Sequence, residues 1–135
     1  MRFAHTDDQL VLADAVAHVL AKELGDGPDH EGSGVSSALA AMGVAGVCVP
    51  DVHGGMGGGL LEAEAVLEAL GRRCVIGPWI DTIAVAPQLL VPLTPHSTDA
   101  AGLLEALVAG ERSVSVAAPP LGGTRRAEPC LVEQA

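Results

Sequence analysis

Five glycines in six positions, from Gly54 to Gly59, form the strongest candidate for a phosphate-binding loop in the sequence. The backbone N–H groups of such loops can bind phosphate at the start of a helix. A P-loop, however, ends in Lys and Ser or Thr, whereas this loop is followed by Leu60, Leu61 and Glu62. The glycine spacing also differs from the dinucleotide fingerprint, and Glu62 would place a negative charge where phosphate lies. We therefore expect the glycines to provide positive φ angles and close backbone approach.

Acidic side chains follow the glycine loop at helical spacing. Glu62, Glu64 and Glu68 could serve as catalytic carboxylates, but their spacing beside Arg72 is typical of a solvated helix face. The five histidines form no dense ligand pattern such as H-E-x-x-H, and the three cysteines form no C-x-x-C. The residues alone therefore predict neither a metal site nor a catalytic residue.

The composition predicts one domain with an unusual core. The chain has 135 residues, 49% of them hydrophobic, yet Phe3 and Trp79 are the only aromatic residues. The core must therefore consist mainly of Ala, Val, Leu and Ile. A net charge of −10 makes nucleic acid and anionic membranes poor partners. We find no signal peptide and no membrane span in the sequence, and we expect a cytoplasmic protein.

Hydrophobic periodicity predicts four or five helices, of which the first two precede the glycine loop. The capping-box spacing of Thr6 and Gln9 predicts a first helix that ends near Leu24. The inner face of this helix is expected to hold Leu12, Val16, Val19 and Leu20, with Val11 and Ala15 at its edges. A short second helix over 38–42, capped by Ser36 or Ser37 and ended by Gly43, is followed by a partly extended segment over 44–50.

Three further helices are expected after the glycine loop. The third should bury Ala63, Val66, Leu67 and Leu70. The fourth should begin near Pro78 and run to Leu90, with an interruption or kink at Pro87. The fifth should cover about 99–109, end at Gly110, and point Leu103, Leu104, Leu107 and Val108 inward.

A single β-strand is predicted at 113–118, where serine and valine alternate. The fold class is therefore mainly α. A bundle-like domain of four to five helices should cover residues 1–112, and 113–135 should hold the short strand and an irregular tail, as the start of a truncated β-domain.

Six stretches carry a family resemblance when they are taken in order. They are Phe3 with Thr6-x-x-Gln9, the run from Leu39 to Pro50, Gly54-Gly55-Met56-Gly57, Leu67-Glu68-Ala69-Leu70-Gly71-Arg72, Pro78, and Leu107-Val108-Ala109-Gly110-Glu111-Arg112. Together they resemble the N-terminal helical domain of the acyl-CoA dehydrogenase family. The similarity covers about residues 3–118, which corresponds to about the first third of a typical member. In this family the Gly-Gly-x-Gly segment is an interhelical loop.

The resemblance implies FAD-dependent α,β-desaturation of an acyl-CoA thioester, in which a carboxylate removes the α-proton and a hydride passes to FAD. In the family, the base lies in a C-terminal helical domain and most flavin contacts lie in a middle β-domain, and this chain matches neither. Its 117–120 segment, Ala-Ala-Pro-Pro, also replaces the Thr-Glu-Pro signature of the family. The matching positions imply that Thr82, Ile83 and Ala86 line the acyl cavity, and that Val116 and Ala118 lie on the strand near the flavin.

Two hypotheses about function follow from the resemblance. The first is a truncated acyl-CoA dehydrogenase that is inactive alone, with acyl-CoA as the implied substrate and FAD as the implied cofactor. The alternative is a non-catalytic subunit or helical interaction module that completes an assembly with a partner chain. Both predict a homo- or hetero-oligomer, because the segment 80–93, which enters the uncharged stretch 82–98, is too apolar for one small helical layer to cover.

Overall fold

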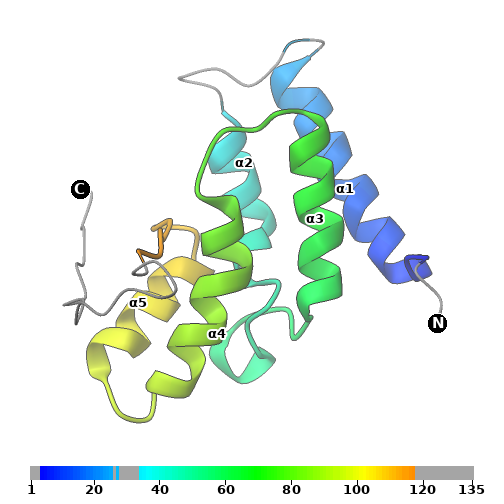
Figure 1. Cartoon of the computed structure of the whole chain (residues 1–135). Coiled ribbons are helices and arrows are strands. Elements are labelled where there is room, and N and C mark those ends of the chain that lie inside the picture. Colours follow the sequence, from blue (N-terminus) through cyan, green and yellow to red (C-terminus); the bar gives the residue numbers. More distant parts are fainter. Residues whose placement is uncertain (1–3, 26, 28–33, 118–135) are drawn as a thin grey trace, which may run out of the picture.

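The computed structural model describes residues 4–25, 27 and 34–117, which fold into helices packed around two hydrophobic clusters (Figure 1). The α-helices are α1 (Asp7–Leu24), α2 (Val35–Met42), α3 (Leu60–Arg72), α4 (Ala86–Leu90) and α5 (Thr98–Val108). The short turns are the 3₁₀ turns η1 (Val44–Gly46), η2 (Asp51–His53) and η4 (Val91–Leu93), and the π-helical turn η3 (Asp81–Val85). In the described part of the chain, no helix is long and apolar enough to cross a membrane. The mainly α fold class is confirmed.

Helix α1 begins and ends where the sequence predicted. Its capping box is complete: the Thr6 hydroxyl accepts from the Gln9 N–H at 3.3 Å, and the Gln9 side chain accepts from the Thr6 N–H at 3.0 Å. Val16 and Leu20 are fully buried, as expected. The predicted edges of the inner face are wrong, because Val11 and Ala15 are exposed. The neighbouring helices cover a narrower stripe of α1 than the apolar pattern suggests.

Helices α1 and α3 lie side by side and run in the same direction (Figure 1). At their N-terminal ends, Gln9 of α1 contacts Glu62 of α3. At the other end, the Arg73 guanidinium donates to the backbone carbonyls of Gly25 and Gly27, so it satisfies acceptors beyond the last turn of α1. This parallel arrangement brings both helix N-termini, and their partial positive charges, to one end of the molecule.

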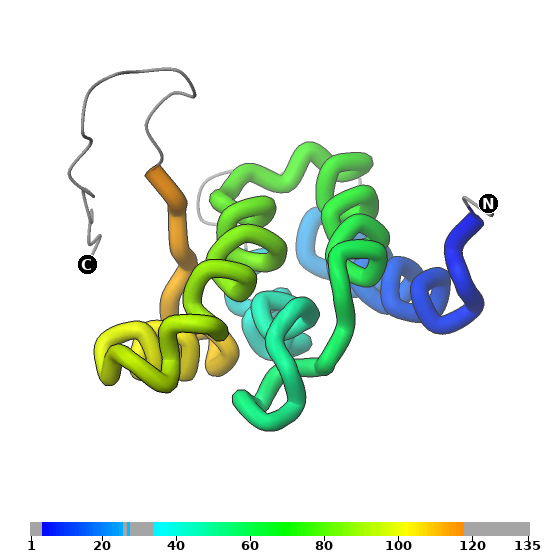
Figure 2. Tube along the Cα trace, turned by 60° about the horizontal axis from the view of Figure 1, so that its bottom comes forward, coloured from blue at the N-terminus to red at the C-terminus, as the bar shows by residue number. Residues whose placement is uncertain are grey.

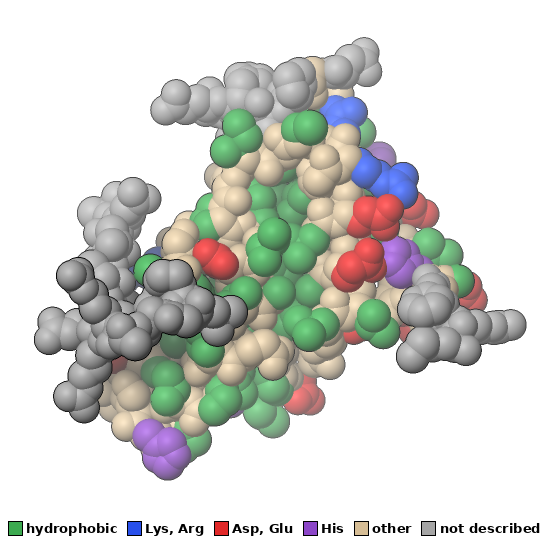
Figure 3. Space-filling model, in the orientation of Figure 1, with side chains coloured by type: hydrophobic (Ala, Val, Ile, Leu, Met, Phe, Trp, Pro, Cys, Tyr) green, Lys and Arg blue, Asp and Glu red, His purple; other side chains and the backbone are tan. Residues whose placement is uncertain are grey.

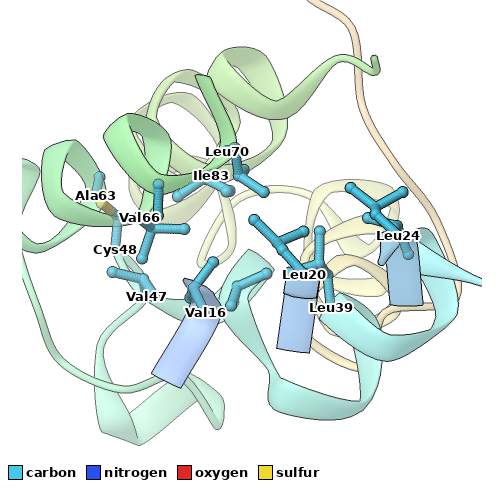
Figure 4. Packing of buried hydrophobic residues seen from close by; sticks show 13 residues of the cluster. Val16, Leu20, Leu24, Leu39, Val47, Cys48, Ala63, Val66, Leu70 and Ile83 are labelled. Carbon is cyan, nitrogen blue, oxygen red and sulfur yellow. The ribbon is translucent and has the colours of Figure 1, made fainter. Parts of the chain in front are cut away.

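The larger hydrophobic cluster lies between α1, α2, α3 and the π-helical turn η3 (Figure 4). Its fully buried members include Leu20, Leu39, Val66 and Ile83, which point toward one another from these four elements. The smaller cluster packs α5 against α4 and the segment before the glycine loop, and it consists of Ala45, Val49, Ala86, Leu104 and Leu107. Aliphatic side chains therefore supply the core, as the composition predicted.

Two expectations for the region before the glycine loop are corrected. Helix α2 begins at Val35 rather than at residue 38, and no side chain caps it, so Ser36 and Ser37 lie inside its first turn and face solvent. The segment 44–50 is not extended but folds into η1 and tight turns, because none of the described residues forms a strand that could pair with its buried backbone. The predicted end of α2 is confirmed, since Gly43 adopts the left-handed conformation with φ of 72°.

The interruption predicted at Pro87 takes the form of the π-helical turn immediately upstream. In this turn the Ala86 N–H donates to the Asp81 carbonyl, one residue farther back than in an α-helix. Proline cannot donate a backbone hydrogen bond, and its ring crowds the carbonyl four residues earlier. The wider turn absorbs this irregularity, and the helical path continues through α4.

The β-strand predicted at 113–118 is wrong for the described residues, 113–117, which contain no strand. Figure 2 shows this segment running beside the helical turns of η3 and α4. A strand needs a second strand as a hydrogen-bonding partner, and here the partners are instead the side chains of Asp81 and Thr82. Residue 118 and the predicted irregular tail lie outside the described residues.

Candidate functional site

The glycine loop has no backbone N–H group left for a phosphate. All six N–H groups from Gly54 to Gly59 donate within the chain. The acceptors are the carbonyls of Asp51 for Gly54 (2.9 Å), Pro50 for Gly55 (3.2 Å), Gly46 for Met56 (2.9 Å), Val49 for Gly57 (2.8 Å) and Val47 for Gly58 (2.9 Å), and the Glu62 carboxylate for Gly59 (2.8 Å). The loop is thus a tight connection between helices, in agreement with the sequence argument.

Glycine is required in this loop for the two reasons expected. Gly54 and Gly57 have φ angles of 79° and 69°, which side chains rarely tolerate. At Gly55 the limit is space, because a Cβ there would lie 2.1 Å from the Val49 carbonyl oxygen. The loop folds back onto the segment before it so closely that a methyl group does not fit.

The anion-binding position at the start of α3 is filled by the chain itself. One carboxylate oxygen of Glu62 accepts from the Gly59 N–H at 2.8 Å, and the other accepts from the Gln9 side-chain amide at 2.9 Å. The hydrogen bond from Gln9, followed by the one from Gly59, lowers the pKa of Glu62 below its ordinary value. Gln9 is buried, and through it the capping boxes of α1 and α3 form one hydrogen-bonded network.

The acidic face of α3 contains a grouping that spacing along the sequence did not reveal. The His5 Nε2 lies 2.6 Å from a Glu64 carboxylate oxygen, and possible ligand atoms of His5, Glu64 and Glu68 lie within 4.8 Å of one another. Arg72, however, already forms an ion pair with Glu68 at 2.5 Å, which lowers the pKa of Glu68. The exposed i,i+4 pair is the solvated helix face that was predicted. His5 escaped notice because it lies 59 residues from Glu64 in sequence.

The three residues that the resemblance implied as acyl-cavity lining lie together on η3 and the start of α4. Thr82, Ile83 and Ala86 have exposed fractions of 2%, 0% and 1%. Ile83 packs in the larger cluster and Ala86 in the smaller, so this helical stretch separates the two. Two open surface grooves, of about 290 and 280 Å³, are lined by other residues. In this chain the implied lining residues are therefore covered.

Thr82 joins the implied acyl-cavity residues to the segment implied to approach the flavin. Its hydroxyl donates to the Val114 carbonyl and accepts from the Val114 N–H, both at 3.0 Å. Beside it, Asp81 Oδ2 accepts from the Val116 N–H at 3.0 Å. The structure thus brings Val116 next to the turn that carries Thr82, while Ala118 lies outside the described residues. Asp81 was missed because a single acidic residue in an apolar run gives no sign of its distant partner.

Several large apolar side chains of the η3–α4–η4 stretch face outward. Ile80, Leu89 and Leu93 are 65%, 50% and 49% exposed, whereas Ile83 of the same predicted apolar segment is fully buried. Figure 3 shows hydrophobic side chains gathered across the middle of one face of the molecule. The apolar segment 80–93 is therefore only partly covered by the helical domain itself.

Comparison with known proteins identifies the helical unit. The family profile "Acyl-CoA dehydrogenase, N-terminal domain" matches residues 6–111, which include all five α-helices. No curated protein and no solved structure gives a significant match. The matched region covers more than half of the chain and runs from the cap of α1 to just beyond the end of α5. The chain therefore belongs to the acyl-CoA dehydrogenase family, and residues 6–111 form its N-terminal domain.

Proposed function

We propose that this chain contributes the helical, acyl-facing part of an FAD-dependent acyl-CoA dehydrogenase, which introduces a double bond between the α- and β-carbons of an acyl-CoA thioester. The family match over residues 6–111 carries this proposal. Residues 1–112 would act as the helical unit, and 113–135 would begin the β-domain.

Four described carboxylates make structural contacts, which supports a structural contribution by this part of the domain rather than an acid–base one. Glu62 caps α3 and binds Gln9, Glu68 pairs with Arg72, Glu64 contacts His5, and Asp81 binds the Val116 N–H. A general base must lie within hydrogen-bonding reach of the proton that it removes. These four carboxylates instead hold parts of the fold together, so we assign the base to another part of the assembled enzyme.

The glycine loop does not fit the pyrophosphate of FAD. A dinucleotide needs backbone N–H groups or basic side chains around its pyrophosphate, and every N–H of the glycine loop is already bonded within the chain. Bound flavin would supply hydride acceptance in the reaction. We propose that most of its contacts come from outside the described residues, with Val116 on the flavin side of the helical domain.

The acyl cavity would form only on assembly. Thr82, Ile83 and Ala86 are covered in this chain, whereas Ile80 and Leu89 of the same stretch are exposed. An apolar surface of this kind is suited to contact with a further domain or subunit. We therefore propose that a homo- or hetero-oligomer in the cytoplasm completes the cavity against η3 and α4.

A domain exchange tests this function. An acyl-CoA dehydrogenase of known activity would receive residues 6–111 of this chain in place of its own N-terminal domain. We expect the chimera to retain FAD, and we expect acyl-CoA to bleach its flavin absorbance. A chimera that folds and binds FAD, but whose flavin no acyl-CoA reduces, would contradict the proposal.

A further inference from the structure

The contacts between η3 and the segment 113–117 follow the pattern of a β-ladder, with side chains in place of the second strand. The Thr82 hydroxyl accepts a hydrogen bond from the Val114 N–H and donates one to the Val114 carbonyl. The Asp81 carboxylate accepts a hydrogen bond from the Val116 N–H. Alternate residues of an extended chain direct their backbone groups to the same side. Two neighbouring side chains of one helical turn thus bind two alternate residues of the segment.

The geometry of the π-helical turn explains how adjacent residues can do this. Alternate residues of an extended segment are about 6.6 Å apart. Consecutive side chains diverge by about 100° on an α-helix and by less in the wider π-helical turn, so those of Asp81 and Thr82 still point in different directions and can reach two such points. Thr82 is 2% exposed, and its hydroxyl has both a donor and an acceptor among its partners, so the buried group is satisfied.

The segment has two distinct edges and two distinct faces. Val114 and Val116 are half-buried, and Val114 packs against the smaller hydrophobic cluster, whereas Ser113, Ser115 and Ala117 are exposed. No hydrogen bond joins the backbone of Ser113 or Ser115 to another described residue. One edge of the segment is therefore held by η3, whereas no described residue forms a hydrogen bond with the backbone of the other edge.

We propose that Asp81 and Thr82 are positioning residues that fix the segment 113–117 against η3. This clamp sets the separation between the helix proposed to line the acyl cavity and the segment proposed to approach the flavin. Its role in catalysis rests on the proposed function, but the clamp itself does not. Thr82 then acts through the Val114 backbone, and its hydroxyl is engaged before any substrate arrives.

Amide hydrogen exchange measured by NMR tests the clamp in the chain itself. We expect the Val114 and Val116 amides to exchange more slowly than those of Ser113 and Ser115. Thr82→Val keeps the shape but removes the hydroxyl, and it should speed Val114 exchange by about 3- to 10-fold, as expected for one net hydrogen bond. Thr82→Ser restores a hydroxyl and should restore protection, while Asp81→Ala should speed exchange at Val116.

Exchange at Val66 in the core of α3 serves as the control for global unfolding, because this residue is fully buried far from the clamp in sequence. Equal protection of the Ser113, Val114, Ser115 and Val116 amides in the wild-type chain, relative to their intrinsic exchange rates, would overturn the clamp. This result would count even if the Thr82→Val variant failed to fold. Unchanged Val114 exchange in a folded Thr82→Val variant would also overturn the clamp.

An extended chimera that carries residues 6–117, and therefore includes the segment 113–117, tests the positioning role separately. Thr82→Val should slow flavin reduction at saturating acyl-CoA, and Thr82→Ser should recover most of the rate. A chimera with lost Val114 protection but an unchanged reduction rate would overturn the positioning role. If acyl-CoA fails to reduce the chimera's flavin while the clamp amides stay protected, the proposed function fails and the clamp stands.

Discussion

Replacing Gly55 with alanine should destabilise the protein through a clash that is defined by the fold of the glycine loop. The new Cβ would lie 2.1 Å from the Val49 carbonyl oxygen and 2.5 Å from the Val49 Cβ. Both neighbours belong to a fully buried residue, so neither can rotate away as a flexible surface side chain would. The loop must separate from the segment 46–50 to make room.

The expected loss combines two effects of that separation. Inserting a methyl group into a packed site costs about 1–3 kcal/mol. The hydrogen bonds of Met56 to Gly46 (2.9 Å) and Gly57 to Val49 (2.8 Å) cross the same gap, and each contributes about 1 kcal/mol net. A loss of about 3 kcal/mol in the free energy of unfolding follows if one such bond is lost along with the packing. Urea denaturation followed by circular dichroism measures this difference.

Gly102→Ala is the matched control for this experiment. It makes the same substitution in helix α5, where nothing lies within 4 Å of the new Cβ. Alanine should stabilise that helix by about 0.5–1 kcal/mol. If Gly55→Ala instead left the free energy of unfolding within about 0.5 kcal/mol of wild type, the close approach and the account of the loop built on it would be wrong.

Three further predictions concern charge, thiol reactivity and association. Hydrogen bonds lower the pKa of folded Glu62, so its stabilisation is present above the unfolded pKa of about 4.3 and is lost as pH falls through the folded pKa. As pH falls over that range, the free energy of unfolding should therefore decline less in the Glu62→Gln variant than in the wild-type protein. An identical decline in the two proteins would refute the hydrogen-bonded network of Glu62 and Gln9. Burial and then the Glu62 charge raise the pKa of the Cys48 thiol. A thiol reagent should therefore modify the exposed Cys74 before Cys48, and mass spectrometry can show the order of modification. Equal labelling rates at the two cysteines would contradict the burial of Cys48. Ile80→Asp should weaken concentration-dependent self-association measured by light scattering, because Ile80 is 65% exposed; a wild-type chain that stays monomeric at high concentration would count against an apolar contact surface.

The local signals that the sequence predicted well are those fixed by chemistry within one turn. The Thr6–Gln9 capping box, the left-handed Gly43 and the interruption near Pro87 each depend on a few neighbouring atoms, and each is found where expected. The glycine loop belongs to the same class, since the absence of Lys and the presence of Glu62 argued against a phosphate site before the N–H groups could be traced.

The errors arise where distant parts of the chain decide the outcome. The valine–serine alternation at 113–118 predicted a strand, but 113–117 binds the side chains of Asp81 and Thr82 in place of a second strand. Spacing placed Val11 at the edge of the inner face of α1, yet its side chain is 69% exposed. The link between Gln9 and Glu62 spans 53 residues, and spacing along one helix cannot reveal it.

The implied site residues show the same division. The predicted fourth helix, from about Pro78 to Leu90, placed Thr82, Ile83 and Ala86 on one helical stretch, and they do share one. The sequence could not show that these side chains are buried or that the Thr82 hydroxyl binds Val114. Both features depend on how α5 and the following segment return to η3. Their role in lining an acyl cavity stays a prediction.

Flavin reduction in the domain-exchange chimera, followed across acyl-CoA thioesters of increasing chain length, tests the central claim most directly. If residues 6–111 supply a wall of the acyl cavity, the chimera's flavin will be reduced, and its preferred chain length will differ from that of the host enzyme because η3 and α4 replace the host's residues. Free CoA, which has no acyl chain, will leave the flavin oxidised. A folded, FAD-loaded chimera that no acyl-CoA reduces, or one with the host's chain-length profile unchanged, would contradict the account.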